Sequence, residues 1–262
     1  MLVVEKVTKT FGGIVANKDI TFSFEEGQIV GLIGPNGAGK STMFNMISNV
    51  FPPTSGTITF QGKRIDRLPS HQMASLGIAR TFQNLQVFKN MTVLENVMVG
   101  RHIQSKTGLL GAAFLTPKAK REEREIYEAS LEQLRFVGLI DDVERKAGSL
   151  PLGKLRLLEL ARALATGPKL LLLDEIAAGL NHRETQEMAR LIQNIREMGI
   201  TVFVVEHDMD LVMNICDKVI VLDQGVKIAE GTPKEVQTNE RVISAYLGVD
   251  IEESNREGVS VV

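Results

Sequence analysis

Residues 34–42, with the sequence GPNGAGKST, constrain the fold of this chain more than any other stretch. They fit the pattern G-x-x-x-x-G-K-[ST], in which a glycine-rich turn connects a strand to a helix. Residues 28–33 read as a buried strand that enters the turn, and residues 42–47 read as a helix that leaves it. A plain glycine-rich turn between a strand and a helix is the alternative interpretation.

The chemistry of such a turn suits a polyphosphate. Its glycines let backbone N–H groups point inward, and the helix that follows adds the positive end of its dipole. Lys40 can reach the β- and γ-phosphate oxygens, and the Ser41 hydroxyl can bind Mg²⁺. The predicted nucleotide-binding residues of the turn are Gly34, Pro35, Asn36, Gly37, Ala38, Gly39, Lys40, Ser41 and Thr42.

The composition is that of an ordinary globular chain, with 262 residues, of which 44% are hydrophobic and 24% charged. The net charge of −2 provides no overall basic field for nucleic acid. Cys216 is the only cysteine, which excludes an internal disulfide, and its apolar helical surroundings predict a buried thiol. No apolar run reaches the roughly 18 residues that a membrane-spanning helix needs.

Strand and helix patterns alternate along the chain. Residues 92–165 are mostly helical in pattern, with a capping box at Thr92 and Glu95 and a solvated, charge-rich helix over 118–137. A last hairpin is expected to turn at residues 223–225. Apolar strands that each follow a helix pattern predict a parallel sheet covered on both faces. The predicted strands are 2–8, 20–24, 28–33, 57–60, 169–173, 201–205, 219–222 and 226–229.

Two adjacent carboxylates follow the apolar run at 170–173. Asp174 would lie at the carboxyl edge of the sheet, where ligands bind in open α/β folds, and could hold Mg²⁺ through water. Glu175 is the candidate to polarise an attacking water. An acidic N-cap for the next helix is the alternative interpretation of this pair.

Three further side chains are candidates for the same site. His207 follows the next buried strand and could donate a hydrogen bond to a γ-phosphate, although a lone strand-end histidine is usually a surface residue. Gln83 lies between the first sheet region and the helical region and could contact Mg²⁺ or water, although an ordinary loop residue would look the same. Phe11 precedes a glycine turn and could stack on adenine, although a lone phenylalanine is more often part of a core.

The order of these motifs resembles the ATP-binding subunit of ABC transporters over residues 2–248. Two such subunits pair head to tail in that family, so each ATP lies between the Walker A loop of one and the signature of the other. Residues 150–156 occupy the signature position, where Gly153 is implied to contact the nucleotide. The resemblance assigns the other roles as follows: Phe11 stacks on adenine, 34–42 form the Walker A loop, Gln83 the Q-loop, Asp174 the Walker B aspartate, Glu175 the catalytic glutamate and His207 the switch histidine.

The resemblance also implies the fold and the cofactors, ATP and Mg²⁺. The expected fold is α/β, a RecA-like P-loop NTPase core with an antiparallel β subdomain and an inserted α-helical subdomain. One ABC ATPase domain would span 1–248, with its core at about 1–90 and 166–248, its helical subdomain at about 91–165 and a flexible acidic tail at 249–262. The implied catalytic residues are Glu175, His207, Lys40 and Gln83, and the implied metal-binding residues are Ser41, Gln83 and Asp174.

Short strings narrow the resemblance to branched-chain amino acid importers: RTFQN at 80–84, AAGLN at 177–181, EHDM at 206–209 and AYLG at 245–248. The insertion at 101–121 resembles the longer of the two ATPase subunits in such systems, the LivG type. The implied partners are a second ABC ATPase subunit, or a second copy in a homodimer, integral membrane permease subunits and, indirectly, a periplasmic or surface amino-acid-binding protein. Nucleic acid is not among them. The implied location is peripheral, at the cytoplasmic face of the inner membrane.

The chain departs from the family pattern at several positions. Pro151, Leu152 and Lys154 stand where Ser, Gly and Gln are usual in the signature L-S-G-G-Q. Pro151 has neither a hydroxyl nor a backbone N–H to donate to a γ-phosphate. Ile176 replaces the proline that usually follows the catalytic glutamate, which could loosen the backbone there, and Asn181 stands where many members have Asp.

These departures predict an asymmetric subunit. The intact Walker motifs, Glu175 and His207 should hydrolyse ATP with a partner's signature, whereas this chain's own signature should serve the opposite nucleotide poorly. The expected function is ATP hydrolysis that powers an importer of branched-chain amino acids. One alternative, motivated by Pro151 and Ile176, is a hydrolytically weak regulatory subunit. Another is a soluble ABC ATPase that remodels ribosomes or DNA, although such chains usually carry two cassettes or a long coiled coil.

Overall fold

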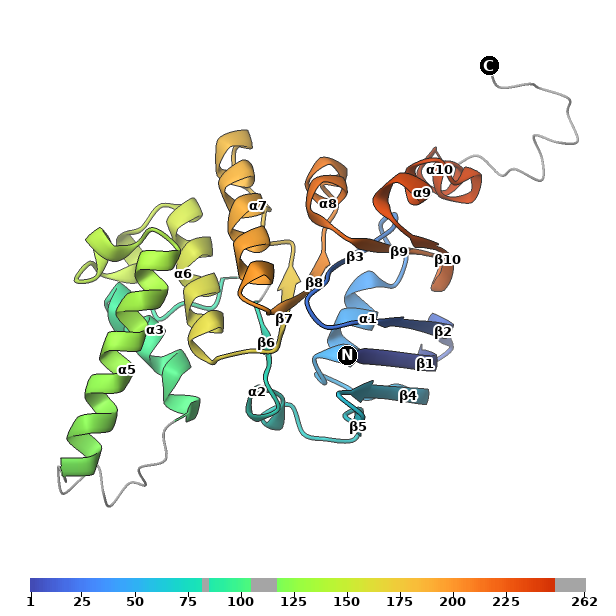
Figure 1. The fold of residues 1–262 in the computed structure, drawn as a ribbon. Helices are drawn as coiled ribbons and strands as arrows, with labels where there is room; N and C mark the ends of the chain where they lie inside the picture. Colours follow the sequence, from blue (N-terminus) through green and yellow to red (C-terminus); the bar gives the residue numbers. More distant parts are fainter. Residues whose placement is uncertain (82–84, 105–116, 248–262) are drawn as a thin grey trace, which may run out of the picture. The chain divides into compact units, whose positions relative to one another are not determined.

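The helices and strands of the chain, labelled in Figure 1, divide between two units. The first unit holds residues 1–70 and those from 192 onward, and the second holds residues 71–191. The predicted division into a core at about 1–90 and 166–248 and a helical subdomain at about 91–165 remains a prediction. The computed structural model describes residues 1–81, 85–104 and 117–247.

The first unit contains the strand that enters the glycine-rich turn. β3 (Ile29–Ile33) lies between β8 (Thr201–Val205) and β9 (Lys218–Asp223) and runs parallel to both. All five residues of β3 and of β8 are buried, which explains their uninterrupted apolar sequences. β10 (Val226–Gly231) pairs with β9 as an antiparallel hairpin. The predicted parallel strands and the last hairpin are therefore confirmed.

A second, antiparallel sheet in the same unit has the strand order β2-β1-β4-β5. Its strands are β1 (Leu2–Phe11), β2 (Ile14–Phe24), β4 (Ser55–Phe60) and β5 (Lys63–Arg64). β2 begins well before the predicted residue 20, because its first half pairs with β1 although most of its side chains, Ile14 and Val15 among them, are exposed. The apolar residues of this half-strand are consecutive and do not alternate with polar ones, so no strand period reveals it.

Phe203 of β8 lies at the centre of the aromatic core of the first unit. Its ring stacks on Phe24 at 5.5 Å and on Phe22 at 6.2 Å, both from β2. It also stacks on Phe44 at 6.4 Å, on the helix α1 (Lys40–Ile47) that leaves the turn. One buried ring on the parallel sheet therefore contacts both the antiparallel sheet and the helix after the glycine-rich turn. The remaining helices of this unit are α8 (Met209–Ile215), α9 (Pro233–Gln237) and α10 (Glu240–Leu247).

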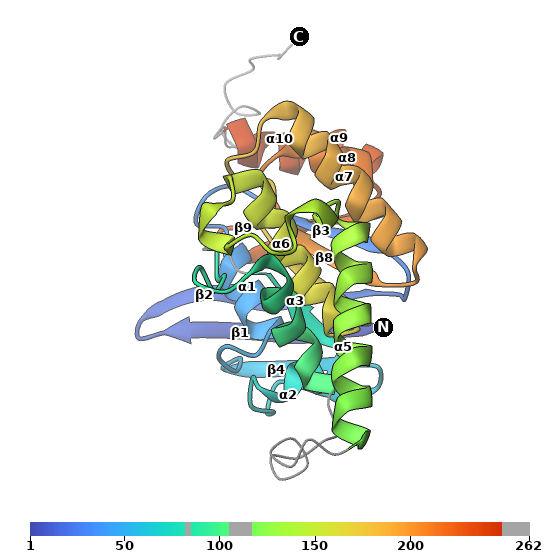
Figure 2. The ribbon, with the colours of Figure 1, turned by 90° about the vertical axis from the view of Figure 1, so that its left-hand side faces the viewer.

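The second unit combines two short parallel strands with a group of helices. β6 (Ile78–Arg80) runs parallel to β7 (Leu170–Asp174). Helices α3 (Val93–Arg101), α5 (Pro117–Phe136) and α6 (Leu152–Ala165) contact one another pairwise, as Figure 2 shows. The other elements are α2 (Gln72–Ser75), η1 (His102–Gln104), η2 (Ile140–Asp142), η3 (Ala147–Ser149) and α7 (His182–Glu197), which continues into the first unit.

The predicted capping box at the start of α3 is confirmed. The Thr92 hydroxyl accepts a hydrogen bond from the Glu95 N–H at 3.1 Å, and the Glu95 carboxylate accepts one from the Thr92 N–H at 2.7 Å. α5 is also the charge-rich helix that was predicted, with only Ile126, Ser130 and Leu134 buried. Within the described ranges, no helix is both long and apolar enough to cross a membrane.

Candidate functional site

The glycine-rich turn lies between β3 and α1, as its sequence predicts. Gly34 has φ +149°, and a Cβ atom there would collide with the backbone oxygen of Leu222 at the end of β9. Gly39 has φ +94°, and a Cβ atom there would lie 2.6 Å from the backbone oxygen of Ala16. Glycine is therefore required at both ends of the turn, because neighbouring strands approach its backbone closely.

The start of α1 suits an anion. Its N-cap is Gly39, which makes no side-chain hydrogen bond, and its first turn contains no acidic residue. The first N–H groups of a helix have no partner within the helix, and the helix dipole places positive charge there. The turn and the helix start therefore form the kind of site that binds phosphate.

Lys40 is bound to the turn itself. Its Nζ atom donates to the backbone oxygen of Gly34 at 2.7 Å and to that of Pro35 at 2.9 Å. These carbonyl oxygens place the ammonium group over the turn, which is the position from which it can meet phosphate oxygens. Ser41, the next residue, lies exposed in the first turn of α1.

The first unit also contains His207 and Phe11. His207 follows β8, its side chain is 63% exposed, and its Nδ1 atom lies 3.9 Å from a carboxylate oxygen of the buried Glu206. The ring of Phe11 is exposed and meets the ring of Phe51 edge-on at 5.3 Å between centroids, while the Lys9 ammonium lies 5.1 Å from the Phe11 centroid. Phe11 is thus not a core residue, and its ring is available to a ligand.

Asp174 and Glu175 belong to the second unit. Asp174 ends β7 and is buried; its N–H donates to the Thr81 hydroxyl at 3.3 Å, and its carboxylate lies 3.6 Å from the Arg80 guanidinium. Burial raises the pKa of Asp174, and the charge of Arg80 opposes that change. Glu175 has φ +48°, a conformation that is rare for a residue with a side chain and that often occurs at functional sites.

The turn after Glu175 is well supported. The Ala178 N–H donates to the Glu175 oxygen at 3.1 Å, and the Leu180 N–H donates to the Ala177 oxygen at 3.1 Å. Ile176, which replaces the usual proline, is fully buried and so anchors this turn in the core. The structure therefore supplies a constraint on the backbone of Glu175 that the sequence analysis did not expect.

The signature segment begins α6. Pro151 is its N-cap and makes no side-chain hydrogen bond. A Cβ atom at Gly153 would lie 2.5 Å from Oε1 of Glu184, at the start of α7. Glu184 and Asn181 form a capping box, with the Asn181 N–H donating to Glu184 at 2.9 Å and the Glu184 N–H donating to Asn181 at 3.0 Å. Asn181 therefore caps the start of α7 within its own chain.

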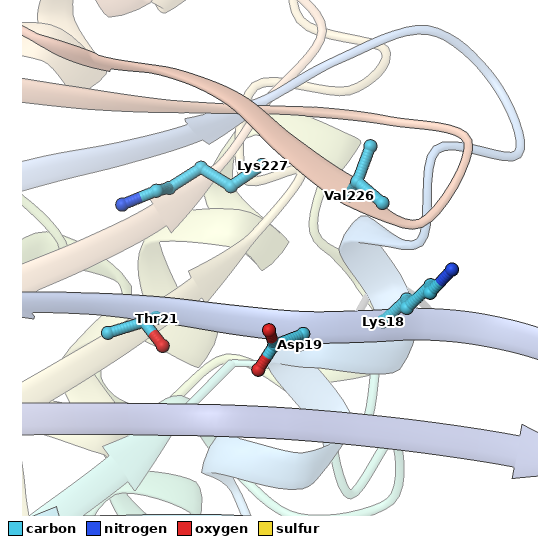
Figure 3. Close-up of a pocket in the computed structure, with 5 residues that line it drawn as sticks. All are labelled: Lys18, Asp19, Thr21, Val226 and Lys227. Atoms are coloured by element: carbon cyan, nitrogen blue, oxygen red, sulfur yellow. The ribbon is translucent and has the colours of Figure 1, made fainter.

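Some predicted features lie elsewhere or outside the described residues. Gln83, the central part of the 101–121 insertion and the 249–262 tail are outside them. An open depression of about 390 Å³ lies between β2 and β10 on the first unit (Figure 3), and no predicted site residue lines it. Its lining residues are Lys18, Asp19, Thr21, Val226 and Lys227. Among the described side chains, no cluster of three or more His, Cys, Asp or Glu could hold a metal ion.

Comparisons with known proteins identify the family. The family model described as ABC transporter matches residues 17–178, and the model described as branched-chain amino acid ATP-binding cassette transporter matches residues 226–252. The chain belongs to the ATP-binding subunits of ABC transporters, of the branched-chain amino acid type. The family, the α/β P-loop fold class and the role of an ATP hydrolase coupled to transport are thereby confirmed.

Individual relatives cover nearly the whole of this ABC ATPase. It is similar to the high-affinity branched-chain amino acid transport ATP-binding protein BraF of Pseudomonas aeruginosa, with 45% identity over 95% of this chain and 98% of the relative. It is 42% identical to the LivG protein of Escherichia coli K12, again over 95% of this chain and 98% of the relative. The crystal structure of the ADP conformation of MJ1267, an ATP-binding cassette, superposes with a TM-score of 0.83 at 34% identity, over 95% of this chain and 98% of that one.

Sequence reasoning missed several residues of this ABC ATPase that hold the motifs in place. Arg80 was noted only within the string RTFQN, and nothing indicated its place beside Asp174, because a single arginine before a loop has no distinctive spacing. Asp142, which pairs with Lys154 of the signature, was also missed. The capping box at the start of α7 could have been found, because Asn181 and Glu184 have the three-residue spacing of that motif directly before a helix.

Proposed function

We propose that this ABC ATPase hydrolyses ATP at the cytoplasmic face of the inner membrane, as a peripheral subunit, to power the import of branched-chain amino acids. The phosphate-binding turn carries this proposal, because Lys40 and the uncapped start of α1 offer fixed positive groups to a triphosphate. The names of relatives that match 95% of the chain supply the class of transported solute. Permease subunits and a second ATPase subunit are the partners that such a role requires.

The proposed roles in the first unit follow from position and exposure. Backbone N–H groups of residues 34–42 and the Lys40 ammonium bind the β- and γ-phosphates and stabilise charge on the transferred group. The exposed ring of Phe11 stacks on adenine. The exposed imidazole of His207, supported by the buried carboxylate of Glu206, donates a hydrogen bond to the γ-phosphate.

The proposed roles in the second unit belong to the two carboxylates. Glu175 accepts a proton from the attacking water, which then adds in line to the γ-phosphorus as the bond to the ADP oxygen breaks. Ser41 and Asp174 would hold Mg²⁺, since a hydroxyl and a buried carboxylate are the oxygen donors that this ion prefers, and Gln83 is a further predicted ligand. Bound Mg²⁺ would neutralise charge on the phosphates.

We further propose that the signature of another subunit completes the nucleotide-binding site on this chain's phosphate turn. This chain's own signature offers a proline side chain at its helix start, which cannot donate a hydrogen bond. Loss of one transition-state donor costs on the order of 2.7–4 kcal/mol in well-studied enzymes. The site built on this chain's phosphate turn and a partner's signature should therefore turn over faster than the reciprocal site.

Reconstitution tests the proposed function. The chain would be assembled with its permease subunits, ATPase partner and amino-acid-binding protein in liposomes, and uptake of labelled leucine would be measured with ATP inside. We expect uptake that requires ATP and that the Lys40→Ala variant loses. An exposed lysine with no predicted role, Lys234→Ala, is the matched control and should keep full uptake. Uptake that persists in Lys40→Ala would contradict the proposal.

A further inference from the structure

Asp142 connects the segment that precedes the signature to the signature itself. It ends η2, and its side chain is only 6% exposed. One carboxylate oxygen accepts from the Arg145 guanidinium at 2.8 Å, and the other accepts from the Lys154 ammonium at 2.5 Å. Arg145 also donates to the backbone oxygen of Ser149 at 3.4 Å. A buried carboxylate thus ties together the chain that enters the signature and the first turn of α6.

The position of Lys154 is unusual for a helix. It lies in the first turn of α6, where the helix dipole disfavours a positive side chain. The N-cap, Pro151, contributes no side-chain oxygen to the N–H groups of that turn, and no acidic residue lies in it. The pairing with Asp142 offsets the unfavourable charge of Lys154, because it supplies a negative charge beside the helix start. Lys154 also lowers the pKa of Asp142, which keeps that carboxylate charged.

The same helix start is held from a second side. Gly153 leaves no room for a Cβ atom against Glu184, and a Cβ at Gly179 would lie 2.8 Å from the Leu152 side chain. The signature backbone is therefore fixed between the start of α7, the turn after Glu175 and Asp142. Of these three supports, the ion pair with Asp142 is the one that depends on charge.

We propose that Asp142, through Lys154 and Arg145, is a positioning residue that sets the signature helix of this chain against the nucleotide held by its partner subunit. This inference rests on the proposed function, in which two subunits share each ATP. Lys154 thus replaces the usual glutamine and acts through an ion pair inside its own chain. The effect of Asp142 on hydrolysis should be confined to the site that this chain's signature completes.

The test separates the two composite sites of an assembled transporter. In one background, Glu175→Gln in this chain silences the site on its own phosphate turn, so the remaining turnover comes from the site that its signature completes. In the other background, the corresponding glutamate of the partner subunit is replaced, so turnover reports this chain's own phosphate turn. Single-turnover hydrolysis of γ-labelled ATP measures both, since it resolves slow rates.

Three variants are placed in each background: Asp142→Asn, Lys154→Gln and Lys154→Arg. We expect the first two to slow hydrolysis on the order of ten-fold where this chain's signature is used, and to change it less than two-fold in the other background. Lys154→Arg keeps the charge and should retain most of the rate. The double variant Asp142→Asn with Lys154→Gln should be no slower than either single variant, because both remove the same interaction.

The outcomes are distinct. Equal slowing in both backgrounds, or no slowing in either, would overturn the positioning role of Asp142. Thermal unfolding of Lys154→Gln, a variant of a side chain that is 42% exposed, shows whether a loss of rate reflects loss of folded protein. If the unmodified complex hydrolyses no ATP, the proposed function fails, and that result does not depend on Asp142.

Discussion

At Pro151 the chain has no hydroxyl to donate, yet its backbone conformation, φ −66° and ψ 162°, is one that serine adopts without strain at a helix N-cap. We expect Pro151→Ser to raise ATP turnover of the assembled complex on the order of 100-fold at the site that this signature completes. The new hydroxyl should also stabilise the folded chain by about 1 kcal/mol, as a cap for α6. Pro151→Ala restores the backbone N–H alone and is the control. Turnover that stays unchanged in the serine variant would show that another donor already compensates.

The backbone of Glu175 is constrained by a hydrogen-bonded turn and by the buried Ile176, so a substitution that keeps its shape should disturb only its chemistry. We expect Glu175→Gln to bind ATP with nearly unchanged affinity and to lower kcat at least 100-fold, since a general base contributes about 10²–10⁴-fold. Equilibrium binding of labelled ATP and steady-state phosphate release measure the two properties. Glu197→Gln, at an exposed position late in α7, is the matched control. Turnover above a tenth of the unmodified rate would remove Glu175 from its proposed role.

Residues were predictable to different degrees. The phosphate turn was found from sequence because its binding groups are contiguous and its glycines have a fixed spacing. Asp142 was not found, because its partner Lys154 lies beyond a turn and only the fold brings the two together. Ile176 was expected to loosen its neighbour, and its burial could not be inferred from a missing proline.

At the scale of elements, the glycines of the phosphate turn differ in what they require. Gly34 combines a positive φ with a neighbouring carbonyl that a Cβ would strike, whereas Gly37 has φ +81° and open space around it. We expect Gly37→Ala to cost about 1–2 kcal/mol of folding free energy, from backbone strain alone. Gly34→Ala should cost at least about 2 kcal/mol more, because β9 must also shift. Urea unfolding followed by circular dichroism compares them, and equal midpoints would show that the approach of Leu222 is easily relieved.

Element prediction succeeded where the pattern was continuous and failed where it was short or mixed. The strands β3, β7 and β8 are buried along their length, so their apolar sequences were sufficient. β6 has only three residues, and the first half of β2 exposes apolar and polar side chains alike, so neither has a period that sequence reasoning can use. The pairing of each with a neighbouring strand, and not its own sequence, makes it a strand.

At the scale of the whole molecule, the order of motifs along the chain determined the family and fold, since an ABC cassette has its Walker A, signature, Walker B and histidine motifs in one sequence order. The site itself could be predicted only in part. Half of each proposed nucleotide site comes from another subunit, and no property of one sequence describes the partner's residues. The same limit applies to the transported solute, which the ATPase subunit does not contact in the proposed role.

Cys216 offers a test that joins folding to nucleotide binding, because it is the only thiol in the chain. Its Sγ atom packs against β3, where a Cβ at Gly31 would lie 3.0 Å away, and burial raises the pKa of the thiol. A thiol reagent should therefore react only when the first unit opens, and the labelling rate then reports the population of that open form.

Since the phosphate turn begins where β3 ends, ATP should bind the closed first unit and not the open one. We expect ATP at about 100 times its Kd to slow Cys216 labelling on the order of 100-fold, equivalent to about 2.7 kcal/mol. The Glu175→Gln chain keeps the nucleotide intact during the measurement, and Lys40→Ala in that chain should abolish the protection. Labelling that ATP leaves unchanged would mean that the thiol is reached by a local movement of α8, which leaves the phosphate turn folded.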